Sequence, residues 1–181
     1  MVYIMLAQGF EEIEALAVVD ILRRGELNIN TVSITENKTV VGAHGISVIT
    51  DITIGDMSED FEALILPGGM PGTLNLKNCK ILEQIIIKAN NDKKIIGAIC
   101  AAPMILGELG LLKDKTGTCY PSFENHLNGC DFKESRVCVS QNIITSRGAG
   151  TAHDFAFEIL KQLQNEEISK NVRKSMLYDI K

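Results

Sequence analysis

Apolar and polar residues alternate along this chain in blocks that predict strands and helices in turn. Short apolar runs are typical of strands buried on both faces, whereas apolar residues spaced three or four apart predict amphipathic helices. Strands are expected at Val2–Ala7, Ile29–Thr35, Ala63–Leu66, Lys94–Ile99 and Gly117–Cys119, an extended or hairpin segment at Val40–Asp51, and a hairpin at Val137–Thr145. Helices are expected at Glu11–Arg24, Cys79–Ala89, Pro103–Leu109, Thr151–Gln164 and Glu166–Tyr178.

One alternating series without repeats or linkers predicts a mostly parallel sheet with helices on both faces. The length of 181 residues suits a single α/β domain over residues 1–181. The net charge of −5 disfavours nucleic acid and anionic membranes as partners. The start of the chain lacks a basic leader and no apolar run is long enough to span a membrane, so we expect a cytoplasmic protein.

The chain contains five cysteines, and their pattern argues against disulfide bonds and against a structural metal site. The count is odd, no C-x-x-C pair occurs, and the three histidines are scattered. These features disfavour both a disulfide framework and a structural zinc site, so no metal is expected. A single cysteine is most simply a small buried hydrophobic residue. Four of the five fit that description, and Cys100 does not.

Cys100 stands where an apolar strand meets the next predicted helix. Ala101 and Ala102 are small enough for a sharp turn, and Pro103 has no N–H to lose in a first helical turn. A turn of this kind strains the backbone of the nucleophile and lifts its side chain above the sheet. The nearby helix N-terminus is expected to favour the reactive thiolate.

A second loop follows the strand Ala63–Leu66 and contains Gly68 and Gly69. Glycines allow main-chain N–H groups to turn outward and form a nest for an anion or a developing oxyanion. The carboxyl ends of parallel strands share one edge of a sheet, where active sites of such folds lie. We therefore expect this loop to approach Cys100.

Glu14 is the third candidate, because it lies on an apolar helix face with Phe10 and Val18. A carboxyl group on such a face is costly unless paired, and burial favours its protonated form. A protonated Glu14 would donate a hydrogen bond to a thiolate or shuttle a proton. Glu11 and Glu12, by contrast, are interpreted as solvent-exposed acidic residues at a helix start.

Together these motifs resemble the ThiJ/PfpI superfamily, also called the DJ-one family after its Parkinson-disease-associated member. The resemblance spans nearly the whole chain and rests on F-E-E-I-E, L-P-G-G, A-I-C-A-A-P and T-S-R-G-A-G-T. The branch it most resembles contains the DJ-one protein and its small bacterial relatives. It implies a flavodoxin-like sandwich, usually a homodimer, and chemistry without a metal or organic cofactor.

Site residues follow from the resemblance one by one. Cys100 matches the family nucleophile and Glu14 matches its acidic partner. Arg147 falls where relatives present a basic residue near the pocket. The main-chain N–H groups that face the cysteine would be those of Gly68, Gly69 and Ala101.

The sequence also departs from the family pattern. The peptidase-like branch has histidine directly after the cysteine, where this chain has Ala101, so the simplest Cys–His dyad is absent. Tyr120 stands where a pocket histidine often precedes proline, and a tyrosine is a poor base near neutral pH. His153 at the last predicted helix is a candidate for the pocket or a dimer contact, and His44 for the pocket rim.

Two readings of function use the same residues. In the first, the protein is a glutathione-independent glyoxalase for methylglyoxal or glyoxal, or a deglycase of glycated protein, with Cys100 as nucleophile. In the second, it is an oxidative-stress sensor or chaperone that works through oxidation of Cys100. Three other functions are disfavoured. This chain lacks the histidine after Cys100 that a cysteine peptidase needs and the correctly spaced His–Glu pair of an amidotransferase. It also lacks an ATP-binding signature for the thiazole biosynthesis role recorded in the name ThiJ.

Overall fold

The computed structural model describes residues 1–178 and contains a central sheet of seven strands. Their order is β10-β11-β7-β6-β1-β2-β5, and every neighbouring pair is parallel except β10 and β11. A parallel centre with one antiparallel edge strand is common in doubly wound folds. The strands are β1 (Val2–Leu6), β2 (Ile29–Ser33), β5 (Ile52–Thr53), β6 (Ala63–Leu66), β7 (Ile95–Ile99), β10 (Val137–Ser140) and β11 (Ile143–Ser146).

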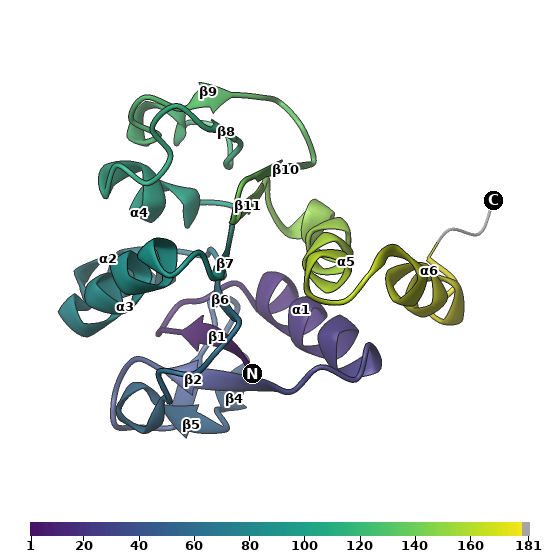
Figure 1. Cartoon of the computed structure of the whole chain (residues 1–181). Coiled ribbons are helices and arrows are strands. Elements are labelled where there is room, and N and C mark those ends of the chain that lie inside the picture. The colour runs from purple at the N-terminus through teal and green to yellow at the C-terminus, as the bar shows by residue number, and fades with distance from the viewer. Residues whose placement is uncertain (179–181) are drawn as a thin grey trace.

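Helices cover both faces of the sheet, as Figure 1 shows. The hydrophobic core is accordingly divided into two clusters, one on each side of the strands. Helices α1 (Glu12–Arg24), α5 (Ala152–Leu163) and α6 (Glu166–Ser175) belong to one side, and α2 (Gly72–Asn78), α3 (Lys80–Asn91) and α4 (Pro103–Glu108) to the other. This confirms the flavodoxin-like α/β sandwich expected from the sequence.

Two small sheets lie beside the central one. Strands β3 (Thr39–Val41) and β4 (Ser47–Ile49) form an antiparallel hairpin, and β8 (Thr116–Gly117) pairs in parallel with β9 (Asp131–Phe132). The hairpin confirms one of the alternatives expected for Val40–Asp51. Short 3-10 helices occur at Ile54–Asp56, Glu124–His126 and Ala149–Thr151.

Three details differ from the sequence expectations. Helix α2 was not expected, because its seven residues are too few to show a helical period and follow Pro71. In place of the strand expected at Gly117–Cys119, the structure has the shorter strand β8, which lies outside the central sheet. In α3, helical spacing places the apolar residues Ile81 and Leu82 on the core side, but only Leu82 is buried and Ile81 is 58% exposed.

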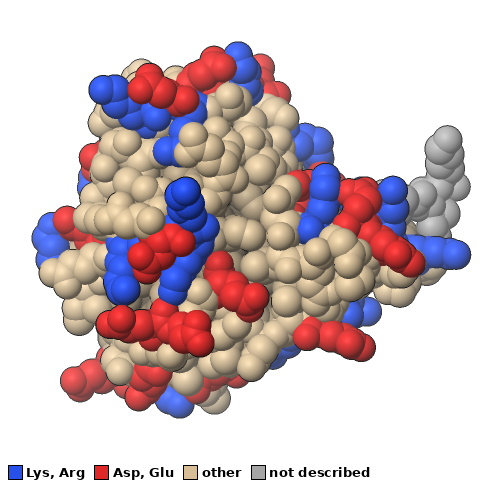
Figure 2. Space-filling view, viewed as in Figure 1, with Lys and Arg blue, Asp and Glu red and all other residues tan. Residues whose placement is uncertain are grey.

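Charged side chains on the face seen in Figure 2 are intermixed by sign. Lys and Arg groups alternate there with Asp and Glu groups, as on an ordinary solvated surface. Among the helices of residues 1–178, none is long and apolar enough to cross a membrane.

Candidate active site

Four loops meet at the carboxyl edge of the central strands, and main-chain hydrogen bonds join them. The Glu11 N–H donates to the Gly68 carbonyl oxygen at 2.9 Å, and the Gly72 N–H donates to that of Gly9 at 3.1 Å. The Cys100 N–H donates to the Ser146 carbonyl oxygen at 3.0 Å. The segments that carry the predicted chemistry therefore share one edge of the sheet, as its parallel topology requires.

Cys100 occupies a strained turn between β7 and α4. Its φ of 63° lies in the left-handed region, which costs a residue with a Cβ about 1 kcal/mol or more. The turn is closed by the Ala102 N–H, which donates to the Ile99 carbonyl oxygen at 3.0 Å, and Pro103 starts the helix. The side chain of Cys100 is thereby presented above the sheet, only partly buried. The strained elbow predicted from the sequence is present.

Glu14 projects from the first turn of α1 to the same point and is only 1% exposed. Its Oε2 accepts a hydrogen bond of 2.8 Å from the Gly68 N–H, and its carboxyl group is hydrogen-bonded to the Cys100 thiol. Burial raises the pKa of Glu14 to about 7, opposed by the Gly68 and Cys100 hydrogen bonds and assisted by the charge of Glu11. Glu14 is therefore poised to gain or lose a proton near neutral pH.

The pKa of Cys100 is also raised, to about 12. Burial is the main cause, followed by the negative charge of Glu14 and its hydrogen bond. The N–H groups of Ala101 and Gly69 favour the thiolate but are outweighed. These N–H groups act in the direction expected from the sequence, but burial and Glu14 shift the pKa of Cys100 the other way. The carboxyl and the thiol instead form a pair that shares one proton once the first has been lost.

Gly68 has a different task from the one expected. Its N–H is engaged by Glu14 and is not available to an oxyanion. A Cβ at this position would lie 2.6 Å from the Cβ of Cys100 and 2.7 Å from Oε2 of Glu14, so only glycine fits. Two of the three predicted N–H groups, those of Gly69 and Ala101, remain directed at the sulfur.

Tyr120 lies next to this pair, although its side chain is half exposed. The Tyr120 N–H donates to the Cys100 carbonyl oxygen at 2.8 Å, and its ring packs against Gly148. A Cβ added to Gly148 would lie 3.9 Å from Oε1 of Glu14, so this glycine also borders the carboxyl group. Tyr120 thus occupies the neighbourhood expected for it, and its role in the pocket remains a prediction.

Arg147 and His153 have partners of their own. The Arg147 guanidinium lies 3.7 Å from Oε1 of Glu134 and 5.9 Å from the ring centre of Phe132, while its Nη1 is buried without a hydrogen-bond partner among the described residues. The His153 ring stacks on Tyr178 with centroids 5.5 Å apart. The structure does not bring either side chain into contact with Cys100, so their pocket roles remain predictions.

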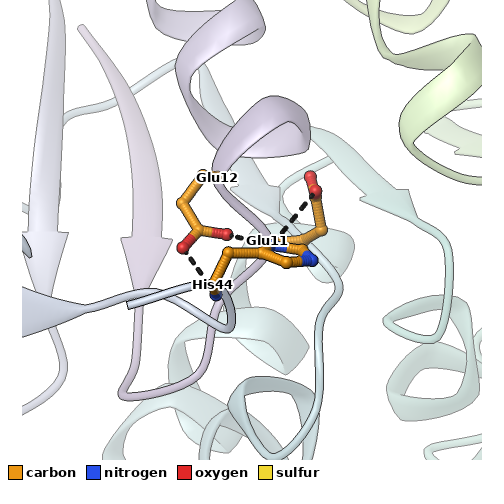
Figure 3. A group of neighbouring side chains, drawn as sticks. All are labelled: Glu11, Glu12 and His44. Atoms are coloured by element: carbon orange, nitrogen blue, oxygen red, sulfur yellow. Dashed lines mark hydrogen bonds and ion pairs between the residues drawn. The ribbon is translucent and has the colours of Figure 1, made fainter. Parts of the chain in front are cut away.

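The sequence interpretation placed Glu11 and Glu12 in solvent, but the Glu11 side chain is only 13% exposed and Glu12 is the more deeply buried of the two. Glu12 is 4% exposed, not solvated, because the β3–β4 hairpin covers it. Its Oε2 lies 2.8 Å from Nδ1 of His44, and its Oε1 accepts the His44 N–H at 2.8 Å. Figure 3 shows Glu11, Glu12 and His44 converging between the start of α1 and the hairpin loop. The G-A-H-G sequence of that loop, at 42–45, gave the only available signal.

Fold and site together define a class: a flavodoxin-like α/β protein with a cysteine at a strand–helix elbow and a buried carboxyl partner. The model of the DJ-1/PfpI family matches residues 1–162. The chain belongs to this family.

Individual relatives agree with this assignment. Protein DJ-1 homolog B of Arabidopsis thaliana is 40% identical over 92% of this chain and 39% of its own length. A Caenorhabditis elegans protein named glutathione-independent glyoxalase DJR-1.2 is 30% identical over 92% of this chain and 89% of its own. Oxidized Toxoplasma gondii DJ-1 superposes with a TM-score of 0.94 at 31% identity, covering 99% of this chain and 98% of that one. The chain spans less than half the length of the Arabidopsis relatives that it matches.

Proposed function

We propose that this protein is a cysteine-dependent, glutathione-independent glyoxalase that converts small 2-oxoaldehydes such as methylglyoxal to 2-hydroxy acids. The observation that carries this proposal is the hydrogen-bonded pair of Cys100 and Glu14, with the pKa of Glu14 raised to about 7 by burial. A nucleophile next to a proton carrier active near neutral pH is what an internal redox reaction of an oxoaldehyde requires. The named activity of the Caenorhabditis elegans relative supports the same reaction class.

The proposed reaction starts when the Cys100 thiolate attacks the aldehyde carbon. A C–S bond forms, and the carbonyl oxygen takes the proton held by Glu14 to give a hemithioacetal. The Glu14 carboxylate then removes the proton from that carbon to give an enediol intermediate and returns it to the neighbouring carbon. The hydroxyl proton passes to the oxygen of that neighbouring carbon, which leaves a 2-hydroxy thioester. Water cleaves the thioester to lactate and regenerates the Cys100 thiol, so that the net reaction converts methylglyoxal and water to lactate. The Gly69 and Ala101 N–H groups would stabilise the negative oxygen. Deglycation of protein would use the same chemistry on aldehyde adducts: the C–N bond of the adduct breaks, the protein amine leaves, and the freed carbon bonds to Cys100.

The test is conversion of methylglyoxal to lactate without glutathione. We expect Cys100→Ser to abolish turnover and Glu14→Gln to lower kcat/KM by about 10²–10⁴. Cys79→Ser is the matched control, because Cys79 is also a partly buried free thiol at the start of a helix. Full turnover in Cys100→Ser, or equal losses in all three variants, would overturn the proposal.

A redox-sensor function is the second candidate, favoured by the only partial burial of Cys100 beside a carboxyl group that is neutral below its pKa of about 7. A thiolate and hydrogen peroxide give a sulfenate and water, and a second peroxide gives a sulfinate. A protonated Glu14 would donate a hydrogen bond to that product. Intact-mass analysis after mild peroxide treatment decides the matter: selective addition of two oxygens at Cys100 supports this function, and unselective oxidation of several cysteines rejects it.

A homodimer and a cytoplasmic location complete the proposal. Large apolar side chains remain exposed on two adjoining elements, α1 and the β3–β4 hairpin: Ile13, Leu16, Val41, Ile46 and Ile49. Contiguous exposed apolar surface is typical of an interface. Light scattering should show a dimer that Ile13→Glu converts to a monomer and Ile81→Glu on α3 does not; a monomeric wild type would refute it. The five free cysteines suit a reducing compartment.

A further inference from the structure

Glu11, Glu12 and His44 lie outside the Cys100–Glu14 pair but bring three donor atoms together. One oxygen of each carboxylate and one imidazole nitrogen all lie within 4.8 Å of one another. Nδ1 of His44 is 2.8 Å from Oε2 of Glu12 and 4.0 Å from Oε1 of Glu11. Ligands held about 2.0–2.1 Å from a tetrahedral zinc ion stand about 3.3 Å apart, a value that these two distances bracket.

Each carboxylate is already oriented for such a role by main-chain N–H groups. Oε1 of Glu12 accepts from the N–H groups of His44 at 2.8 Å and Ile46 at 3.4 Å, which leaves Oε2 facing the imidazole. Oε2 of Glu11 accepts from the Glu14 N–H at 2.7 Å, which leaves Oε1 facing the same imidazole. In each carboxylate one oxygen is held by a main-chain N–H and the other is turned to a common centre. Hydrogen bonds that orient ligands in this way are typical of metal sites.

The hairpin backbone also approaches α1 closely enough to enclose one side of this cluster. A Cβ at Gly42 would collide with the Glu12 carboxyl group, so the loop reaches this position only with glycine there. The side chain of Glu12 is 5% exposed while that of His44 is 70% exposed. In the single chain, one side of the cluster is therefore fixed by protein, and the other is exposed.

A second histidine–glutamate pair in the chain provides a comparison. Nδ1 of His126 lies 2.9 Å from Oε1 of Glu108, much as His44 lies beside Glu12. The third member there is the Lys77 ammonium, 2.6 Å from Oε2 of Glu108. A cation already neutralises that carboxylate, whereas Glu12 has a second carboxylate, Glu11, as its neighbour.

We propose that Glu11, Glu12 and His44 form a binding site for a divalent transition-metal ion of the zinc class, which ties the β3–β4 hairpin to the start of α1. Imidazole and carboxylate ligands together suit Zn²⁺ and Co²⁺. Binding displaces the proton shared between His44 and Glu12, and two carboxylates compensate the charge of the ion. The site adjoins the catalytic pair through the bond from the Glu14 N–H to Glu11.

The experiment is Co²⁺ and Zn²⁺ titration of the full-length, EDTA-treated protein by calorimetry and visible absorption. We expect one equivalent of Co²⁺ per chain without a sulfur charge-transfer band, and affinity at least about tenfold weaker in His44→Ala and Glu12→Gln. His126→Ala is the matched control and should bind like the wild type, as should Cys100→Ser.

Three outcomes would overturn the proposal. They are no binding by the wild type, unchanged binding in His44→Ala, and a sulfur charge-transfer band in the wild type together with loss of binding in Cys100→Ser, which would place the ion on thiols. His44→Ala also removes a hydrogen bond to the buried Glu12 carboxyl group, so thermal unfolding without metal is used to verify that this variant is folded under the titration conditions. Glyoxalase turnover is not part of this readout, so its absence would leave the metal site unaffected.

Discussion

Glu12 and Glu14 are two residues apart on the same helix, and both are almost completely buried, yet their pKa values move in opposite directions. Burial by itself would raise the pKa of both carboxyl groups. In Glu12 the His44 side chain and the His44, Glu12 and Ile46 N–H groups outweigh burial and lower the pKa. In Glu14 the hydrogen bonds from the Gly68 N–H and the Cys100 thiol do not outweigh burial, and the pKa rises to about 7. One carboxyl group becomes a fixed charge that holds a hairpin, and the other becomes a proton carrier.

This difference shows that the partners of a buried carboxyl group decide its role, because burial alone acts on both in the same way. Glu12 is covered by a polar hairpin loop that supplies donors. Glu14 faces the glycine turn and a thiol, which supply fewer. Substitutions that remove the charge or the partners of either residue test the comparison directly.

The largest expected contrast is in stability. Glu14→Gln should raise the free energy of unfolding at pH 8 by about 3 kcal/mol, because the rise in pKa from 4.5 to about 7 amounts to about 1.4 kcal/mol per unit. Between these values the folded protein keeps a proton that the unfolded chain has released, so stability falls as pH rises through this range. The gain should disappear below about pH 4.5.

Glu12→Gln should do the reverse and lower the free energy of unfolding at pH 8 by about 1–3 kcal/mol, since it weakens hydrogen bonds to a charged group. That loss of stability should shrink as the pH falls. The lowered pKa of Glu12 means that the folded protein stabilises its charged form, and protonation at low pH removes that stabilisation. Urea unfolding at pH 8 and pH 4.5 measures both variants. Changes of the same sign at pH 8 would break the comparison.

A smaller effect is expected at the glycine that serves Glu14. Gly68→Ala should cost about 1–3 kcal/mol in stability and lower the alkylation rate of Cys100, because the new methyl group would press on Cys100 and Glu14. Gly150→Ala is the control, since its Cβ would meet nothing within 4 Å. Equal stability of the two variants would show that Cys100 and Glu14 do not pack closely against the Gly68 backbone.

The sequence predicted the layers of the fold and the positions of Cys100 and Glu14, because apolar runs and glycine turns are local signals. It did not predict that Glu12 is buried, since the covering hairpin lies about thirty residues away and its contact depends on tertiary structure. For the same reason it assigned the Gly68 N–H to an oxyanion, although Glu14 accepts its hydrogen bond, and it did not anticipate that burial and Glu14 outweigh the N–H groups at Cys100.

The central claim is that Glu14 and Cys100 titrate as one pair, and the pH dependence of Cys100 alkylation by iodoacetamide tests it most directly. Peptide mapping follows Cys100, with Cys79 as internal control. In the wild type we expect the rate to rise with a midpoint near pH 7, where the pair loses its first proton. In Glu14→Gln the midpoint should move up by about one pH unit or more, because burial still raises the thiol pKa and no carboxylate remains to take the proton. Identical profiles for the two proteins would contradict the account.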